Sequence, residues 1–304
     1  MTSPRQPTIF LPHGGGPCFW MDAPPPFGKQ SWEKLRQYLE GVVASLPAPP
    51  KAFLVVTAHC EAETPTVRTA LSPGMIYDYY GFPKHTYELQ YPAPGEPDLG
   101  HRVEALIAAA GLPVAEDAER GFDHGVFVPF LIVDPAAKIP VVMLSLQKNL
   151  DPALHIALGK ALTPLRDEGV LIVGSGMSYH DLRHFRDGDG RASQAFDSWL
   201  GQAMTAPDPA ARLTELIPVI GGSFLFRIIA RHLVAFMPAA GDPLMTYLAR
   251  QATIYTGSAV NHFYATGGPA MVRQNIRPFV RKATGIRVLQ DISGGNVEGD
   301  GAES

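Results

Sequence analysis

Three short apolar runs that each lead to a histidine constrain the fold of this chain most strongly. The runs cover residues 8–12, 52–58 and 170–176, and the histidines that follow them are His13, His59 and His180. Short runs rich in β-branched residues and bounded by glycine or proline are typical of buried strands. Because ligands of open α/β sheets collect at the carboxyl ends of the strands, we expect the three imidazoles at one edge of one sheet. The pattern predicts a metal site with a spare base.

Predicted strands alternate with predicted helices along the first two thirds of the chain. The strands are expected at 7–12, 52–58, 113–115, 140–146 and 170–175, and the helices at 31–45, 98–110, 152–168 and 191–205. Ser31 is the expected N-cap of the first helix. This alternation predicts an α/β fold, a single domain whose mostly parallel central sheet is flanked by helices, with the metal site at the carboxyl ends of the strands.

The C-terminal third has a weaker pattern. Residues 215–237 are apolar and are interpreted as a buried helical pair or hairpin. Residues 290–304 are acidic and rich in glycine, with almost no apolar side chains, which predicts a disordered acidic tail.

Composition excludes several classes of partner. The chain has 304 residues, is 46% hydrophobic and carries a net charge of −4, so nothing calls for nucleic acid or an anionic membrane surface. No apolar run reaches the roughly 18 residues that a membrane span needs. Cys18 and Cys60, the two cysteines, are interpreted as small buried apolar side chains. With few thiols and no signal-peptide pattern at the N-terminus, we expect a cytoplasmic protein.

The segment 61–97 is rich in proline, glycine and aromatic residues. Its rings are Tyr77, Tyr79, Tyr80, Phe82, His85, Tyr87 and Tyr91. Long ordered loops often cover active sites, and aromatic walls suit a planar aromatic substrate. A surface loop held in place by its own aromatic residues is the alternative, and the sequence does not choose between the two.

The local sequences of the histidines suggest separate roles. His13 precedes three glycines without the GxGxxG or Lys-Ser/Thr pattern of a phosphate loop, which favours a metal ligand. His180 is followed by Asp181, which could orient the ring of a general base. His124, between Asp123 and Gly125, fits either a substrate-facing group or a buried, hydrogen-bonded histidine. Two or three protein ligands with open positions suit Fe(II) or Zn(II), one ion per chain.

Four motifs in this order resemble the class III extradiol ring-cleavage dioxygenases. They are HGGGP (13–17), TAH (57–59), FDHGVFVP (122–129) and GSGMSYH (174–180), and the resemblance covers about residues 7–200. The branch is similar to the 4,5-DOPA extradiol dioxygenase-like proteins, which are related to the catalytic subunit of protocatechuate 4,5-dioxygenase. The resemblance implies an α/β catalytic domain over 7–289 and a mononuclear Fe(II) or Zn(II) site. It assigns His13 and His59 as ligands, His180 as the acid/base, and His124 as a second catalytic histidine facing the substrate.

The third ligand implied by the resemblance lies in a divergent segment. The branch has a His-Pro-x-x-Glu-His-Leu stretch, and here His232 aligns with the ligand, while Arg227 and Arg231 replace the usual histidine and glutamate. A cation beside a metal site disfavours a divalent ion by direct repulsion. His262 is the alternative ligand; His232 is preferred because the residues after it also match.

The resemblance implies ring cleavage of a catechol-type aromatic with O₂, which suggests a role in the catabolism of aromatic compounds. The expected partners are this small molecule and O₂, with no nucleic acid and no membrane, and homo-oligomer formation is left open. Two other functions remain: a non-catalytic binding protein on the same fold, and a zinc-dependent hydrolase using the same histidines.

Overall fold

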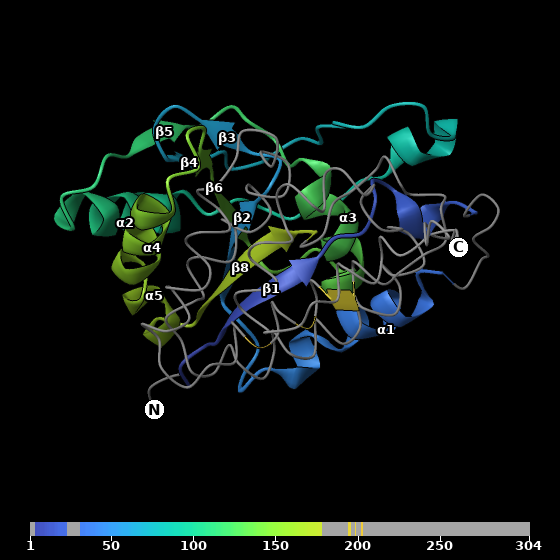
Figure 1. The fold of residues 1–304 in the computed structure, drawn as a ribbon, viewed down its shortest axis with the longest axis horizontal. Helices are drawn as coiled ribbons and strands as arrows, with labels where there is room; N and C mark the ends of the chain where they lie inside the picture. Colours follow the sequence, from blue (N-terminus) through green and yellow to red (C-terminus); the bar gives the residue numbers. More distant parts are fainter. Residues whose placement is uncertain (1–3, 23–30, 178–193, 196–197, 199–201, 203–304) are drawn as a thin grey trace, which may run out of the picture.

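The computed structural model describes residues 4–22 and 31–177, together with 194, 195, 198 and 202. Its centre is a six-stranded sheet in the order β1-β8-β2-β6-β4-β5 (Figure 1). The strands are β1 (Thr8–Pro12), β8 (Val170–Gly176), β2 (Ala52–Thr57), β6 (Val141–Leu144), β4 (Thr66–Arg68) and β5 (Ala115–Asp117). Within this sheet only the β4–β6 pair is antiparallel. The predicted α/β class with a mostly parallel sheet is confirmed.

The register of the central strands aligns their carboxyl ends. Strand β8 lies between β1 and β2, and Ser175 on β8 is paired with Leu11 on one side and Thr57 on the other. The ladder continues past the strands, because the His13 amide donates to the Gly176 carbonyl at 3.2 Å. The residues that follow β1 and β2 therefore start from the same edge of the sheet.

Helices cover both sides of the central strands. Figure 1 shows α1 (Glu33–Gly41) and α3 (His124–Val133) on one side, and α2 (Pro97–Ala109), α4 (Pro152–Ala161) and α5 (Pro164–Asp167) on the other. Helix α1 packs on α3, and α2 packs on α4. Every residue of β1, β2, β6 and β8 is buried as a result, which explains why these strands read as continuous apolar runs.

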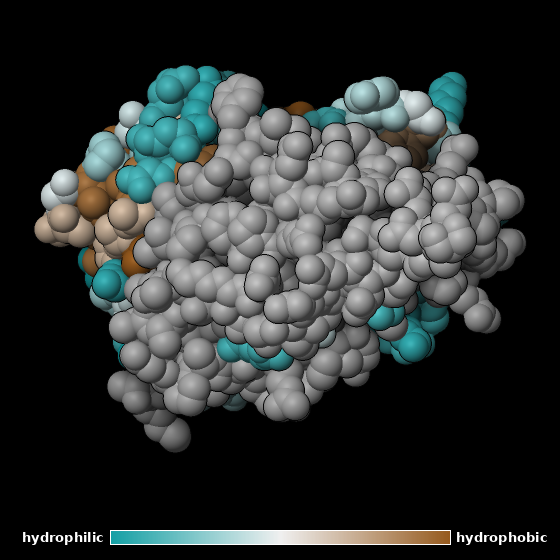
Figure 2. Space-filling model, in the orientation of Figure 1, coloured by the Kyte–Doolittle hydropathy of each residue, from teal (hydrophilic) through white to brown (hydrophobic). Residues whose placement is uncertain are grey.

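The remaining elements are short. Strand β3 (Glu61–Ala62) pairs with β7 (Leu146–Gln147) in parallel, and the 3₁₀ turns are η1 (Cys18–Trp20), η2 (Val43–Ser45) and η3 (Lys84–Glu88). No helix among the described residues is long and apolar enough to cross a membrane. The part of the surface that Figure 2 colours mixes hydrophilic and hydrophobic residues. Cys18 and Cys60 are both buried, as the sequence predicted.

Several predicted boundaries need correction. Helix α1 begins at Glu33 with Trp32 at its N-cap, so Ser31 is not the cap. The helix predicted over 152–168 is interrupted at 162–163 and resumes as α5, because Pro164 has no amide hydrogen to continue the ladder and disfavours a helical residue before it. The strand predicted at 113–115 lies at Ala115–Asp117.

Helix α3 has no counterpart in the sequence-based prediction. Nine of its ten residues are buried, so it lacks the polar face that gives a helix its sequence period. Of the helix predicted over 191–205, residues 194, 195, 198 and 202 are helical. The rest of that helix, the 215–237 segment, the domain end at 289 and the 290–304 tail lie outside the described residues.

Candidate metal centre

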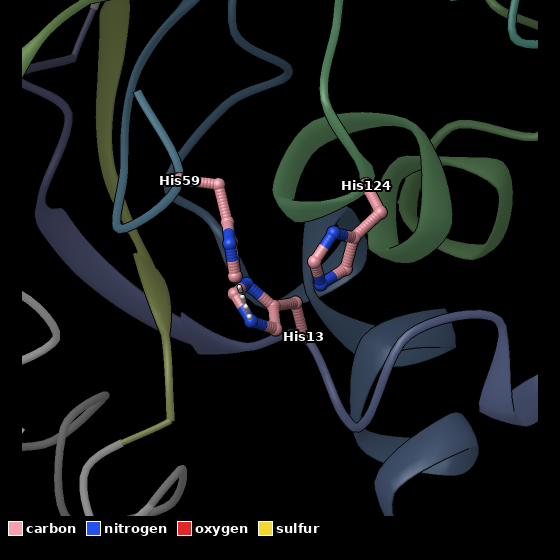
Figure 3. Close-up of side chains that lie close together, drawn as sticks. All are labelled: His13, His59 and His124. Carbon is pink, nitrogen blue, oxygen red and sulfur yellow. Dashed lines mark hydrogen bonds between the residues drawn. The ribbon is translucent and has the colours of Figure 1, made fainter. Parts of the chain in front are cut away.

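Three histidines from three different elements meet at the carboxyl edge of the sheet. His13 directly follows β1, His59 lies two residues beyond β2, and His124 is the first residue of α3 (Figure 3). One ring nitrogen from each lies within 4.8 Å of the others. His13 and His124 are buried, at 1% and 6% exposure. The parallel sheet thus brings together three residues that are far apart in sequence: His59 lies 46 positions after His13, and His124 lies 65 positions after His59.

The spacing of His13 and His59 suits a shared metal ion. Their Nε2 atoms are 3.2 Å apart. Imidazole nitrogens bind zinc at about 2.0–2.1 Å, so two ligands at octahedral or tetrahedral angles have nitrogens about 2.8–3.4 Å apart. Neutral imidazole is a ligand for both iron and zinc. The donor set and its spacing therefore fit the mononuclear site expected from the sequence.

A proline inside helix α3 and the Ser175 hydroxyl together favour one tautomer of His13. Pro129 has no amide hydrogen, so the carbonyl of Gly125, four residues earlier, lacks its usual helical donor. The Ser175 hydroxyl donates to that carbonyl. Because its single hydrogen is used there, the Ser175 oxygen accepts from His13 Nδ1 at 3.0 Å. The Nδ1–H tautomer leaves His13 Nε2 unprotonated, as a metal ligand must be.

One carboxylate serves the other two rings. Asp78 Oδ1 accepts from the Nδ1 and from the backbone amide of His124, at 2.8 and 2.9 Å. Its Oδ2 lies 3.5 Å from His59 Nδ1. Burial raises the pKa of Asp78, but the hydrogen bonds and charge of His124 outweigh burial, and its pKa lies below the ordinary value. Asp78 is therefore a carboxylate, which can only accept hydrogen bonds.

A second acidic residue, Asp123, is buried next to His124 and connects helix α3 to strand β2. Asp123 caps α3 by accepting from the Gly125 amide at 3.0 Å, and it accepts from the Thr57 hydroxyl at 2.9 Å. Complete burial and the charge of Asp78 raise its pKa to about 6. A side chain at Gly125 would place its Cβ 2.2 Å from Thr57 Oγ1. The close approach of helix and strand explains why glycine follows His124.

The glycines after His13 allow a tight turn beneath the aromatic segment. Gly14 and Gly16 have φ of +79° and +54°, a left-handed conformation that favours glycine. A Cβ on Gly14 would lie 2.4 Å from the Cys18 sulfur, and one on Gly16 would lie 3.1 Å from the Phe82 ring. The predicted ligand function of His13 thus rests on a backbone that only glycine forms without strain.

The aromatic residues of segment 61–97 lie in different places, some beside the histidine cluster and others in the hydrophobic core. The Tyr79 ring lies 5.8 Å from that of His124, and its hydroxyl donates to the Thr86 carbonyl at 2.5 Å. Tyr91 is fully buried against Phe122, and Tyr80 is 91% exposed. Tyr79 thus lies beside the histidines, whereas Tyr91 anchors the segment in the core.

The structure brings together three of the histidines singled out by the sequence. His13, His59 and His124 form the cluster, while His180, His232 and His262 lie outside the described residues. Sequence reasoning missed Asp78, which carries no motif signal, and Ser175, which lies inside the GSGMSYH motif without a predicted role. Another group of ligand-type side chains, His101, Glu104 and Glu116, lies at the surface with two exposed members.

The three histidines at the carboxyl edge of the sheet have the donor atoms of a metal-binding enzyme site, and comparison with known proteins gives the family of the chain. Residues 7–219 match the family described as the catalytic LigB subunit of aromatic ring-opening dioxygenase. The match covers more than half of the chain, and the chain belongs to this family. The resemblance drawn from the four motifs is confirmed.

Named relatives agree with this assignment. The chain is 42% identical over 202 residues to a 4,5-DOPA dioxygenase extradiol of Beta vulgaris, a match covering 65% of this chain and 72% of that protein. It is 44% identical over 182 residues to the dioxygenase tasH of Hapsidospora irregularis, covering 58% and 55%. A third relative, the 4,5-DOPA dioxygenase extradiol of Escherichia coli strain K12, is 38% identical, and the chain spans 63% of its length.

A solved structure shares the fold. The crystal structure of the uncharacterized protein JW3007 from Escherichia coli K12 superposes with a TM-score of 0.56 at 28% identity, covering 78% of this chain and 88% of that one. The three curated relatives named above are matched over 55% to 72% of their length, so some of them extend well beyond the matched segment.

Proposed function

We propose that this chain is a metal-dependent extradiol dioxygenase that opens the ring of a catechol-type aromatic with O₂. The observation that carries the proposal is the pair of Nε2 atoms of His13 and His59, which lie 3.2 Å apart at the sheet edge, with His13 buried and His59 partly buried. Membership in an aromatic ring-opening dioxygenase family and relatives named 4,5-DOPA dioxygenase extradiol support the reaction class.

In this proposal His13 and His59 hold Fe(II) or Zn(II), one ion per chain, and His232 supplies the third ligand that the resemblance implies. When bound, the metal would orient a diol and dioxygen next to each other. The nearby Asp78 carboxylate would partly balance the charge of a divalent ion bound there.

His124 and His180 are the proposed acid/base groups. The Nδ1–H of His124 is held by Asp78, so its Nε2 is the atom that exchanges a proton with a bound diol. The resemblance assigns the main acid/base role to His180. Tyr79, beside His124, contributes an aromatic wall that suits a planar ring and limits the entry of water.

The test combines metal analysis with oxygen uptake on the full-length chain. We expect about one Fe or Zn per chain after anaerobic loading, and oxygen consumption on addition of Fe(II) and a panel of catechols. Metal without oxygen uptake would favour the zinc-hydrolase alternative. The absence of metal under every loading condition would refute the dioxygenase proposal and favour a non-catalytic binding protein.

Four variants assign the roles of the histidines. His13→Ala and His59→Ala should abolish metal binding, because each removes a ligand at a site with few donors. His180→Ala and His124→Ala should keep the metal and lose most turnover. Loss of metal in His124→Ala would instead identify His124 as the third ligand and remove the need for His232. Stoichiometric metal in His13→Ala would refute the proposed site.

A further inference from the structure

We propose that Asp78 is the positioning residue of this centre: it holds His59 and His124 in the tautomer and orientation that turn both Nε2 atoms to the same point. The inference rests on the proposed function in one respect, that the cluster receives a metal and a diol. It adds a residue that lies outside all four motifs and within a segment whose role the sequence left open.

The contacts of Asp78 are divided between the two rings. Oδ1 takes the Nδ1 of His124 at 2.8 Å, and Oδ2 lies 3.5 Å from the Nδ1 of His59. Since an ionised carboxylate only accepts, His124 Nδ1 donates to Oδ1, and the charge of Oδ2 favours a hydrogen on His59 Nδ1. A neutral ring with its hydrogen on Nδ1 has Nε2 free to bind a metal. The two ring centroids are 4.0 Å apart and the ring planes are tilted by 48°, which is close enough for one carboxylate to reach the Nδ1 atoms of both rings.

The backbone around Asp78 is fixed to the segment before α3. The Ile76 amide donates to the Phe122 carbonyl at 2.7 Å, and the Phe122 amide donates to the Gly74 carbonyl at 2.8 Å. Gly121 permits this contact, because a Cβ there would lie 2.2 Å from the Gly74 carbonyl oxygen. Asp78 is thus carried by the same backbone segment that meets the start of the helix bearing His124, and its position follows that of the histidine.

His13 shows the same principle with a different partner. Its Nδ1 is oriented by the neutral hydroxyl of Ser175, whereas His59 and His124 share one charged group. Acceptors on the far nitrogen commonly orient metal-binding histidines and raise their basicity, and losing one lowers metal affinity about 10- to 100-fold. Because Asp78 serves two rings, its loss disturbs two of the three histidines together.

Asp78→Asn is the informative variant, because it has nearly the same shape and only one acceptor atom. If the amide oxygen keeps the two hydrogen bonds from His124, the NH₂ group faces His59 Nδ1. His59 then has to accept at Nδ1 and carry its hydrogen on Nε2, a tautomer that cannot bind a metal. The matched control is Glu168→Gln, at the opposite end of β8, where the carboxylate pairs with Arg102 at the surface.

The first measurement is metal affinity, by competition with a chelator, with thermal unfolding as the check on folding. We expect 10- to 100-fold weaker binding in Asp78→Asn and no change in Glu168→Gln. The visible absorption of the Co²⁺-loaded protein should also change in Asp78→Asn, because the ligand geometry changes. Wild-type affinity together with a wild-type Co²⁺ spectrum would overturn the proposal.

A second measurement needs no variant. Nitrogen-15 NMR of the histidine side chains in the metal-free wild-type protein should show His59 and His124 with hydrogen on Nδ1. Absence of hydrogen from Nδ1 of His59 would overturn the proposal even if Asp78→Asn did not fold. The outcomes separate from those of the proposed function: a weaker metal site in Asp78→Asn, with no catechol-dependent oxygen uptake by the wild type, would support positioning and refute the dioxygenase.

Discussion

Replacing Ser175 by alanine tests the link between a helix proline and the metal site. Ser175 is fully buried on the central strand β8, and its hydroxyl bridges the Gly125 carbonyl and His13 Nδ1. The substitution removes one oxygen and introduces no steric clash. The Gly125 carbonyl, which has no helical donor because of Pro129, then also loses the hydrogen bond from Ser175. His13 Nδ1 loses its acceptor.

The expected magnitude follows from these two groups. A buried polar group left without a partner costs about 1–3 kcal/mol, so the loss of both partners in Ser175→Ala should lower the free energy of unfolding of the metal-free protein by about 2–6 kcal/mol. His13 also becomes able to place its hydrogen on Nε2, so metal affinity should fall about 10- to 100-fold. Urea unfolding and chelator competition measure the two effects separately.

Ser145→Ala is the matched control. Ser145 is also buried, and its oxygen accepts from the Thr66 amide at 2.9 Å; among the described residues it forms no hydrogen bond with the three clustered histidines. Its loss should destabilise the protein by about 1–3 kcal/mol and leave metal affinity unchanged. If Ser175→Ala bound metal as tightly as the wild type, or lost no stability, the argument from Pro129 to His13 would be refuted.

Two further predictions concern stability. Burial raises the pKa of Asp123 from 3.8 to about 6, so the folded state holds this proton more tightly than the unfolded chain. The Asp123 contribution to stability of the metal-free protein should therefore decrease by about 3 kcal/mol as pH rises from about 4 to about 6. Asp123→Asn should remove that slope in urea unfolding across this range, and an unchanged slope would assign it to other groups. Gly95→Ala should cost at least about 1–3 kcal/mol, since its Cβ would lie 1.8 Å from the Ala70 carbonyl oxygen, whereas Gly41→Ala meets nothing within 4 Å and should fold with wild-type stability.

Much of the fold was predictable because its signals are local. The strands β1, β2 and β8 are buried on both faces, so they read as continuous apolar runs, and their histidines follow at the ends. Helix α2 appeared within one residue of its predicted ends. Helix α3 was missed for the opposite reason: it is buried all round, and its apolar run shows no helical period.

The sequence by itself was enough to predict the parallel sheet, the family, and His13, His59 and His124 as candidate site residues. These signals are local, because strand patterns and glycine-flanked histidines involve only neighbouring residues. Only the tertiary structure decided which groups orient the rings. Asp78 comes from an irregular loop. Ser175 binds the Gly125 carbonyl, which lacks a helical donor because of Pro129, 46 residues before Ser175. Hydrogen bonds of this kind form between residues that the tertiary fold brings together. The periodicity of side chains along the sequence does not show which distant residues will meet.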